Sequence, residues 1–249
     1  LIGGFLGEVS VRLSFISQAL LLMAVAVMFY LICLPDKSSE ISGVSKRNFL
    51  KEANPFQAFA DSRYFMTRAF VLLFLINIFT NFGNTGFDQA FNYYLKDVLS
   101  LSSSYNGIVK ALVGLISFAA NMTLCIWIIN KTRVKRSMLI IVSACTVSAL
   151  MVTLSSQIVI FIIFSVLVYA GYSVSVPVLQ NMIAEKADNA QKNLVMGFFN
   201  STQSLGSIAG SLLAGFIYSV HTRLPFFCVF LAYGLAASAA LLYALRKEE

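Results

Sequence analysis

The feature that most constrains this chain is a series of apolar runs, separated by short polar breaks. Each run is close to the length of about 20 residues that an α-helix needs to cross a bilayer. Apolar residues make up 58% of the sequence and charged residues only 12%. The short alternating segments typical of barrel strands are not found in these runs. We therefore predict an all-α polytopic membrane protein.

Seven complete transmembrane helices are predicted. They lie at about residues 14–34, 69–95, 106–129, 137–154, 158–184, 193–220 and 224–245. Pro35 ends the first of them, because proline cannot continue a helix. Residues 1–7 are apolar and rich in glycine, and we interpret them as the end of an eighth helix. Since neither Met nor a basic segment precedes them, we expect a fragment of a longer protein.

The longest polar stretch, residues 35–67, is predicted to be a cytoplasmic linker between two domains. The first domain, residues 1–34, holds the partial helix and the first complete one, and the second, residues 68–249, holds six helices. Of the 18 Lys and Arg residues, 14 fall on the side of this linker, three on the other side and one within a span. Cytoplasmic loops carry such an excess, so the linker and the C-terminus are predicted to be cytoplasmic. The net charge of +7 is explained by these loops, and the expected partner is the lipid bilayer rather than nucleic acid.

The helix at residues 69–95 carries five polar residues on one face. At about 100° per residue, they fall within an arc of about 80°. They are Asn77, Asn81, Asn84, Asp88 and Asn92. A carboxylate at bilayer depth costs about 3 kcal/mol and is tolerated where it faces a bundle interior or water. This face therefore favours an aqueous cavity, and the alternative is a helix contact made through amide hydrogen bonds.

Two other helices have polar faces. Lys110, Ser117 and Asn121 share one face of the helix at 106–129, and Lys110 either extends to the outer interface, which is the preferred interpretation, or approaches Asp88. Asn200 shares an arc of about 60° with three serines of the helix at 193–220. That arc either lines a cavity or holds helices together. The ladder Gly206, Gly210 and Ala214 predicts a close helix contact, because only small residues permit one.

The sequence lacks the motifs of several functional classes. The four cysteines, Cys33, Cys125, Cys145 and Cys228, are scattered through apolar runs, and the only histidine is His221. This composition predicts no metal site and no other cofactor. An enzyme is not expected, because HExxH, a Ser–His pair and paired intramembrane carboxylates are all missing from the sequence. GxxxxGK[ST], the phosphate-binding motif of ATP-driven proteins, is missing too.

The segment Pro177 to Gly215, PVLQNMIAEKADNAQKNLVMGFFNSTQSLGSIAGSLLAG, resembles the tenth helix, short loop and glycine-rich eleventh helix of major facilitator superfamily transporters. Gly3-Gly4 is similar to the end of an antiporter motif in the fifth helix, and Asn130 to Arg136 takes the place of a basic loop. The resemblance covers the whole chain and is strongest to the drug:proton antiporter branch, which contains multidrug and tetracycline exporters. It implies a major facilitator fold in which residues 68–249 form helices seven to twelve. The N-terminal half of the same transporter would be the missing partner.

We accordingly expect a secondary transporter of the plasma membrane that exports amphipathic, drug-like compounds by alternating access, driven by protons. The alternative is a proton- or ion-coupled importer of a small polar nutrient such as a sugar. Asp88 is the only acid within a complete span, so within this half it is the candidate for binding and releasing the proton. The alternatives are that the missing half supplies the proton carrier, or that Asp88 only attracts a cationic compound or only anchors the packing. The candidates for the substrate cavity or for coupling are Asn77, Asn81, Asn84, Asp88, Asn92, Lys110, Ser117, Asn121, Tyr169, Asn200 and Gln203.

Overall fold

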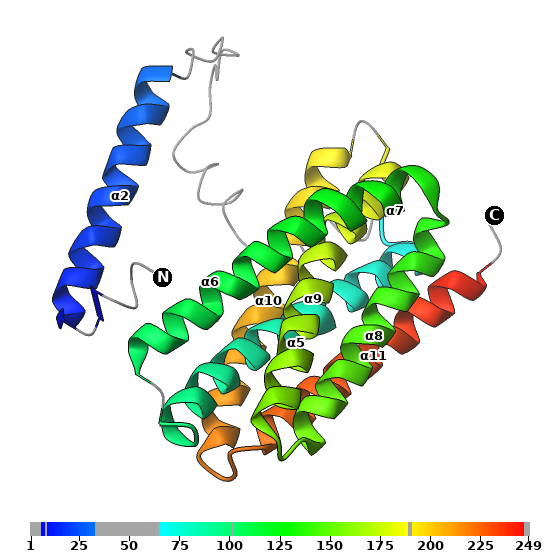
Figure 1. The fold of residues 1–249 in the computed structure, drawn as a ribbon. Coiled ribbons are helices and arrows are strands. Elements are labelled where there is room, and N and C mark those ends of the chain that lie inside the picture. Colours follow the sequence, from blue (N-terminus) through cyan, green and yellow to red (C-terminus); the bar gives the residue numbers. More distant parts are fainter. Residues whose placement is uncertain (1–5, 8, 33–64, 101, 189–190, 247–249) are drawn as a thin grey trace.

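The computed structural model describes residues 6–7, 9–32, 65–100, 102–188 and 191–246. Within these ranges every long element is a helix (Figure 1). The elements are α2 (Val11–Ile32), α5 (Arg68–Asp97), α6 (Ser103–Ala120), the π-helix η2 (Asn121–Cys125), α7 (Ile126–Lys131), α8 (Val134–Leu154), α9 (Ile158–Lys186), α10 (Lys192–Tyr218) and α11 (Leu224–Leu245). Since α6, η2 and α7 follow one another without a break, each of the seven predicted spans corresponds to one long helix. Most of the predicted partial helix and most of the predicted linker lie outside the described residues.

Six of the seven long helices are both long enough and apolar enough to cross a membrane. The exception is α10, which has 27 residues but an apolar content diluted by Asn200, Gln203 and its serines and glycines. Such polar and small residues are typical of a transmembrane helix that is packed against other helices. The helix α10 is therefore long enough to span and differs from the others only in composition.

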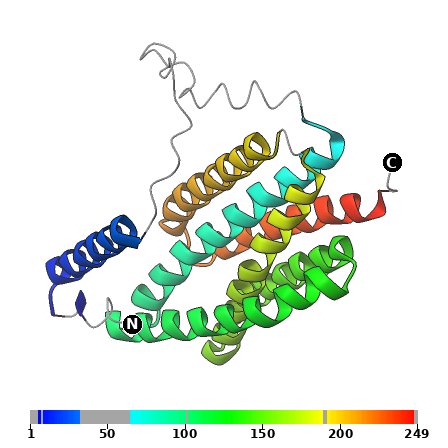
Figure 2. The ribbon, with the colours of Figure 1, turned by 90° about the horizontal axis from the view of Figure 1, so that it is seen from above.

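The helix α5 lies at the centre of the bundle. It packs mainly against α10 and α11, and α8 packs against both α9 and α11, while α6 lies along α9. Figures 1 and 2 show these helices side by side, with α2 apart from them. More than half of the apolar part of α5 is buried, against about a sixth of the span formed by α6, η2 and α7. The polar residues of α5 are consequently held between helices, whereas much of α6 is open on its outer side.

The contact between α5 and α10 depends on glycines. A Cβ atom added to Gly206 would collide with the carbonyl oxygen of Ile78, and one added to Gly210 would collide with that of Phe82. Gly206, Gly210 and Ala214 are all buried. The predicted small-residue contact is therefore confirmed. Gly215, which belongs to the other face of α10, has no atom within 4 Å of its Cβ position.

Aromatic rings fill the space between the helices at both ends of the bundle. Phe87 and Phe91 of α5 pack against Phe161 and Tyr169 of α9 and Phe226 of α11, with ring centroids 5.2–5.8 Å apart. Edge-to-face and stacked rings at such separations add about 0.5–1.5 kcal/mol per pair to the area that they bury. This aromatic core fixes how α5 and α9 are rotated relative to each other.

The basic loop predicted at residues 130–136 is shorter than expected, because α7 continues to Lys131 and α8 begins at Val134. Pro177 lies inside α9, which remains a single helix of 29 residues. Transmembrane helices accept proline when their neighbours satisfy the freed backbone group. The π-helix that begins at Asn121 was not predicted, since a single widened turn leaves no periodic signal in the sequence.

Candidate functional site

An ion pair between α5 and α6 forms the centre of the candidate site. The Lys110 ammonium donates a hydrogen bond to Oδ1 of Asp88. The Tyr169 hydroxyl of α9 lies 2.8 Å from that same carboxylate oxygen and 2.8 Å from Lys110 Nζ. Lys110 therefore does not extend to the membrane interface, contrary to the preferred interpretation of the sequence. The structure shows the alternative arrangement, in which the two charges offset each other.

Two aromatic rings complete the surroundings of the Lys110 ammonium. Its Nζ lies 4.7 Å from the ring centroid of Tyr169 and 5.5 Å from that of Phe91. Both distances are within the range of about 6 Å at which the electron-rich face of a ring attracts a cation. The ammonium is thus bound by a carboxylate, a phenol oxygen and two ring faces. These are the groups that proteins use to bind organic cations.

Amides extend the cluster toward the end of α5. Asn92 Nδ2 donates to Oδ2 of Asp88 at 3.3 Å, and Asn106 Nδ2 of α6 donates to Oδ1 of Asn92 at 3.3 Å. The Asp88 carboxylate thus accepts hydrogen bonds at both of its oxygens. The side chains of Lys110 and Asp88 nevertheless keep 30% and 38% of their surface exposed. Part of the surface of the pair is therefore left uncovered by the described helices.

The other end of the polar face of α5 is closed. Asn77 and Asn81 are each 1% exposed. Asn77 Nδ2 donates to the Phe199 carbonyl and to Thr202 Oγ1 of α10, both at 2.9 Å. The Tyr172 hydroxyl of α9 donates to Asn81 Oδ1 at 2.7 Å. In this structure the two asparagines therefore hold α5 against α9 and α10 and are not open to a cavity.

The remaining candidates are distributed around this core. Asn84 is half-buried, and its Oδ1 has no hydrogen-bond partner among the described residues. Gln203 is half-buried on α10, and the Ser117 carbonyl accepts a hydrogen bond of 3.5 Å from Ser173. Asn121 is half-buried at the first residue of η2, and Asn200 is exposed on α10. Of the eleven candidates, the ion-pair cluster brings together Asp88, Asn92, Lys110 and Tyr169.

The sequence reasoning missed several partners of these residues, namely Phe91, Asn106, Tyr172 and Thr202. Asn106 stands four positions before Lys110, so the helical repeat places both on one face of α6. The spacing alone could therefore have predicted that Asn106 lies beside Lys110. Phe91 and Tyr172 offered none, because an aromatic residue in an apolar helix is most often a core residue. Their polar roles depend on which neighbouring helix they face.

The described residues contain no group of three or more His, Cys, Asp or Glu side chains that could bind a metal ion. In the same ranges Cys125, Cys145 and Cys228 are free thiols. The chemistry that these side chains offer is thus charge pairing, hydrogen bonding and cation–π contact.

The family model of the Major Facilitator Superfamily matches residues 1–159 and, in a second match, residues 73–249. The chain belongs to this superfamily. Together with the helices described above, the match confirms the predicted fold class, an all-α polytopic membrane protein of the major facilitator type. Because the superfamily consists of transporters, its match also agrees with the prediction that the chain is not an enzyme.

Three curated relatives carry names from drug resistance. The chain is 23% identical to quinolone resistance protein NorA of Staphylococcus aureus strain COL, over 99% of this chain and 60% of that protein. It is 24% identical to multidrug resistance protein 1 of Bacillus subtilis, over 96% and 59% respectively. For multidrug resistance protein 2 of the same organism the identity is 22%, over 90% and 55%. The chain thus spans less than two thirds of the length of each of these relatives.

Proposed function

We propose that this protein is a secondary transporter that exports amphipathic organic compounds, lipophilic cations among them, in exchange for protons. The observation that carries the proposal is the environment of the Lys110 ammonium. A carboxylate and two ring faces already bind a cation there, and the site is partly open. A cationic compound that enters this site would find the same groups, with apolar helix surface around them for its hydrophobic part.

Asp88 is proposed to couple the transport to protons. A proton on its carboxylate removes the negative charge, so the carboxylate no longer attracts either Lys110 or a cationic compound. Loss of that proton restores the attraction. If the site opens first to one side of the membrane and then to the other, Asp88 carries a proton inward and releases a compound outward. Lys110 is the tethered cation that occupies the carboxylate when neither a proton nor a compound is bound.

The other polar candidates are proposed to line the path of the compound. Asn84, Asn121 and Asn200 are half-buried or exposed on α5, η2 and α10, and an amide can donate to and accept from a passing molecule. In the superfamily, substrate sites lie near the bilayer midplane between two six-helix halves. The first half of the same transporter is therefore the proposed partner that completes the opposite wall. The names of the relatives, which refer to quinolone and multidrug resistance, support export of drug-like compounds.

The placement in the membrane is part of the proposal. We place the protein in the plasma membrane, with the 35–67 linker and the C-terminus in the cytoplasm, because Lys and Arg gather on that side. Among the described helices, Lys131, Arg133 and Lys186 lie at the end of the bundle where α7 and α9 finish and α8 begins. The opposite loops, around residues 98–102 and 219–223, hold few cations.

The proposal is tested with the intact protein reconstituted into vesicles that have an imposed pH gradient. We expect accumulation of tetraphenylphosphonium and of neutral amphipathic dyes when the lumen is acidic, and no accumulation of glucose whether the lumen is acidic or alkaline. Asp88→Asn preserves the shape of the side chain and removes its proton exchange. It should therefore abolish gradient-driven accumulation of the neutral dye while leaving exchange of that dye at equal pH intact.

Asp97→Asn is the matched control, because Asp97 is an exposed carboxylate at the last residue of α5. It should transport like the unmodified protein. Full pH-driven accumulation by the Asp88→Asn variant would exclude the coupling role. If only the binding of cations were lost, Asp88 would instead attract the compound without carrying the proton. Accumulation of glucose alone, with the gradient reversed so that the lumen is alkaline, would show that the protein is a nutrient importer.

A further inference from the structure

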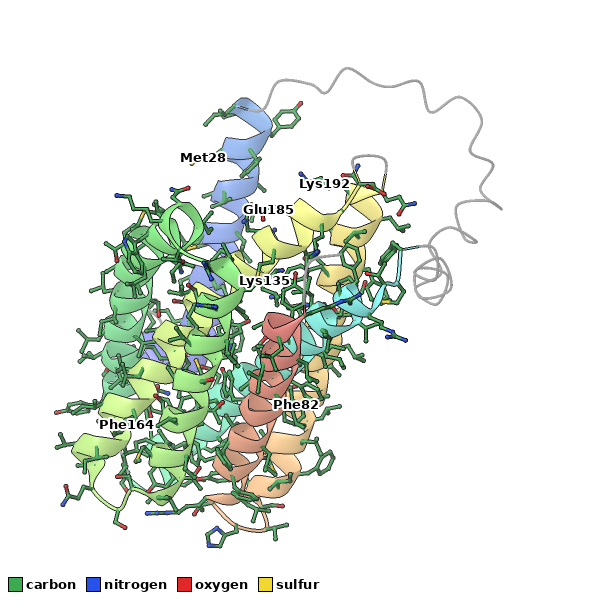
Figure 3. The ribbon with its side chains drawn as sticks, turned by 90° about the vertical axis from the view of Figure 1, so that its right-hand side faces the viewer. Met28, Phe82, Lys135, Phe164, Glu185 and Lys192 are labelled. Carbon is green, nitrogen blue, oxygen red and sulfur yellow. The ribbon has the colours of Figure 1, made fainter. Side chains whose placement is uncertain are left out.

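A cavity lies at the end of the bundle where α8 begins and where α9 and α11 finish. Its volume is about 580 Å³. It is lined by Arg133, Val134, Lys135, Arg136, Met182, Glu185, Lys186, Tyr243 and Ala244. Figure 3 shows Lys135 and Glu185 at this end, far from Phe164 at the other end of the bundle. The cavity shares no residue with the cluster around Asp88.

The charge of this cavity is strongly positive. Four of its lining residues are cations, and the only acid in its lining is Glu185, which accepts a hydrogen bond of 2.9 Å from Asn181. Arg133, Arg136 and Lys186 are exposed, so their charged ends can move toward a ligand. The Lys135 ammonium lies 5.6 Å from the ring centroid of Tyr243, which keeps this cation at the cavity wall.

The start of α8 adds further positive charge. Arg133 takes the N-cap position, where its side chain makes no capping hydrogen bond, and the first turn of α8 has no acidic residue. The first amides of a helix have no partner within that helix and carry a partial positive charge. Val134, the first residue of α8, lines the cavity. The positive end of the α8 dipole and the side-chain cations thus face the same cavity.

The surface next to the cavity is apolar. Tyr243 and Met182 are buried at its inner side, each 4% exposed. On the outer side of the same turns of α11, Leu241, Leu242 and Leu245 expose 46%, 59% and 71% of their surface. A cationic cavity beside exposed leucines, at the end of a transmembrane helix, matches the boundary between lipid headgroups and acyl chains.

We propose that this cavity binds the phosphate headgroup of an anionic phospholipid, whose acyl chains lie along α11. The shape of the site distinguishes this from simple charge attraction. Lys131 at the end of α7 and Arg68 at the start of α5 are exposed at the same end of the bundle but do not line the cavity. An acidic peptide would bind the cationic cavity without contacting the exposed leucines. A lipid would contact both surfaces, the cavity through its headgroup and the leucines through its acyl chains. The inference rests on the membrane fold and not on the proposed transport activity.

The test compares lipid binding by the intact protein in detergent. Phosphatidylglycerol is the probe, and phosphatidylcholine, which has no net charge, is its reference. We expect phosphatidylglycerol to raise the thermal midpoint more than phosphatidylcholine does, and native mass spectrometry to find it bound. The double variant Arg133→Gln/Lys186→Gln should bind phosphatidylglycerol about 30-fold more weakly, since each cation near an anionic lipid contributes about 1 kcal/mol.

The matched control is Arg68→Gln/Lys131→Gln, which removes one Arg and one Lys from the same end but leaves the cavity intact. It should retain the binding of phosphatidylglycerol. Equal loss in both double variants would overturn the proposal in favour of general surface charge. An equal shift with soluble glycerol phosphate would show a site for a free phosphate instead. If the double variant does not fold, the single variant Lys186→Gln decides, because unchanged binding there would also overturn the proposal.

Discussion

Asp88 and Lys110 carry opposite charges at a depth where either charge alone would be costly. Transferring an ion from water into a protein costs several kcal/mol of desolvation free energy. An oppositely charged partner and further hydrogen bonds offset much of that cost. Tyr169 and Asn92 supply those further hydrogen bonds, at 2.8 and 3.3 Å from the carboxylate. Because the pair is also partly exposed, Asp88 and Lys110 can separate without either charge being fully buried among apolar groups. A pair of this kind suits a site that must bind and release ions.

Replacing Lys110 by Gln should strengthen the binding of tetraphenylphosphonium. The substitution removes the tethered cation and leaves the carboxylate and both rings in place. We expect about tenfold tighter binding, because a half-exposed charge pair with a cation–π contact is worth about 1–2 kcal/mol. Equilibrium binding to the intact purified protein at pH 8 measures the change.

Lys96→Gln is the control for that measurement, since Lys96 is an exposed cation in the last turn of α5. Its binding of tetraphenylphosphonium should not change. If Lys110→Gln weakened the binding while Lys96→Gln did not, Lys110 would be part of the binding surface for the compound. It would then not be a competitor for the carboxylate.

The sequence predicts the polar face of α5 but not the partners of its residues. A helical repeat shows which side chains share a face, because that depends only on local geometry. Which face opposes it depends on the rotation and tilt of other helices. Tyr169 stands 81 positions from Asp88, and nothing local in the sequence connects the two. For the same reason Asn77 and Asp88, which share one face, differ in this structure: one is buried against α10 and the other is open.

At the scale of the elements, α10 shows how small residues set the distance between helices. Gly206 and Gly210 lie against backbone atoms of α5, which cannot rotate away as a side chain can. Hydrophobic attraction between helices is weak in lipid, so close packing of this kind is a main source of stability. The same helix has an open face at Gly215, where a side chain would meet no atom within 4 Å.

Gly210→Leu should therefore reduce the amount of folded protein in the membrane, whereas Gly215→Leu on the same helix should not. Forcing extra carbon atoms into a packed contact costs about 1–3 kcal/mol, and more where the neighbour is backbone. Fluorescence-detected size-exclusion chromatography of both variants measures the monodisperse fraction. Normal yield for Gly210→Leu would mean that α5 and α10 are farther apart in the folded protein than this structure shows.

The positions of the elements are predicted well by the sequence because hydrophobic length is a local property. Helices α8, α9 and α11 begin and end within about three residues of the expected positions. The errors fall at the connection after Lys131, where polar and basic residues continue a helix past the apolar core. A charged residue at a helix end is compatible with both helix and loop, so composition alone does not decide the boundary.

The cations of the whole molecule are distributed unequally between the two ends of the helix bundle. The helices α7, α9 and α11 finish at the end where α5 and α8 begin, and most cations of the described chain lie there. The cavity proposed to bind lipid is at this end as well, while Lys96 and Arg223 lie at the opposite end of the bundle and Arg12 lies at the start of the separate helix α2. An excess of cations at one end predicts which end stays in the cytoplasm, because the rule acts through the loops next to the spans.

Labelling of single cysteines in intact cells checks this orientation. In a background in which all four native cysteines are replaced, Ser156→Cys, between α8 and α9, should react with a membrane-impermeant maleimide added outside. Lys131→Cys, at the end of α7, should react only after the membrane is permeabilised. Both positions are exposed in the structure, so access to the thiol does not limit either reaction. The reverse pattern would place the basic end outside, and the loop cations would then need another explanation than topology. Equal labelling of both positions in intact cells would instead show that the chain is inserted in two orientations.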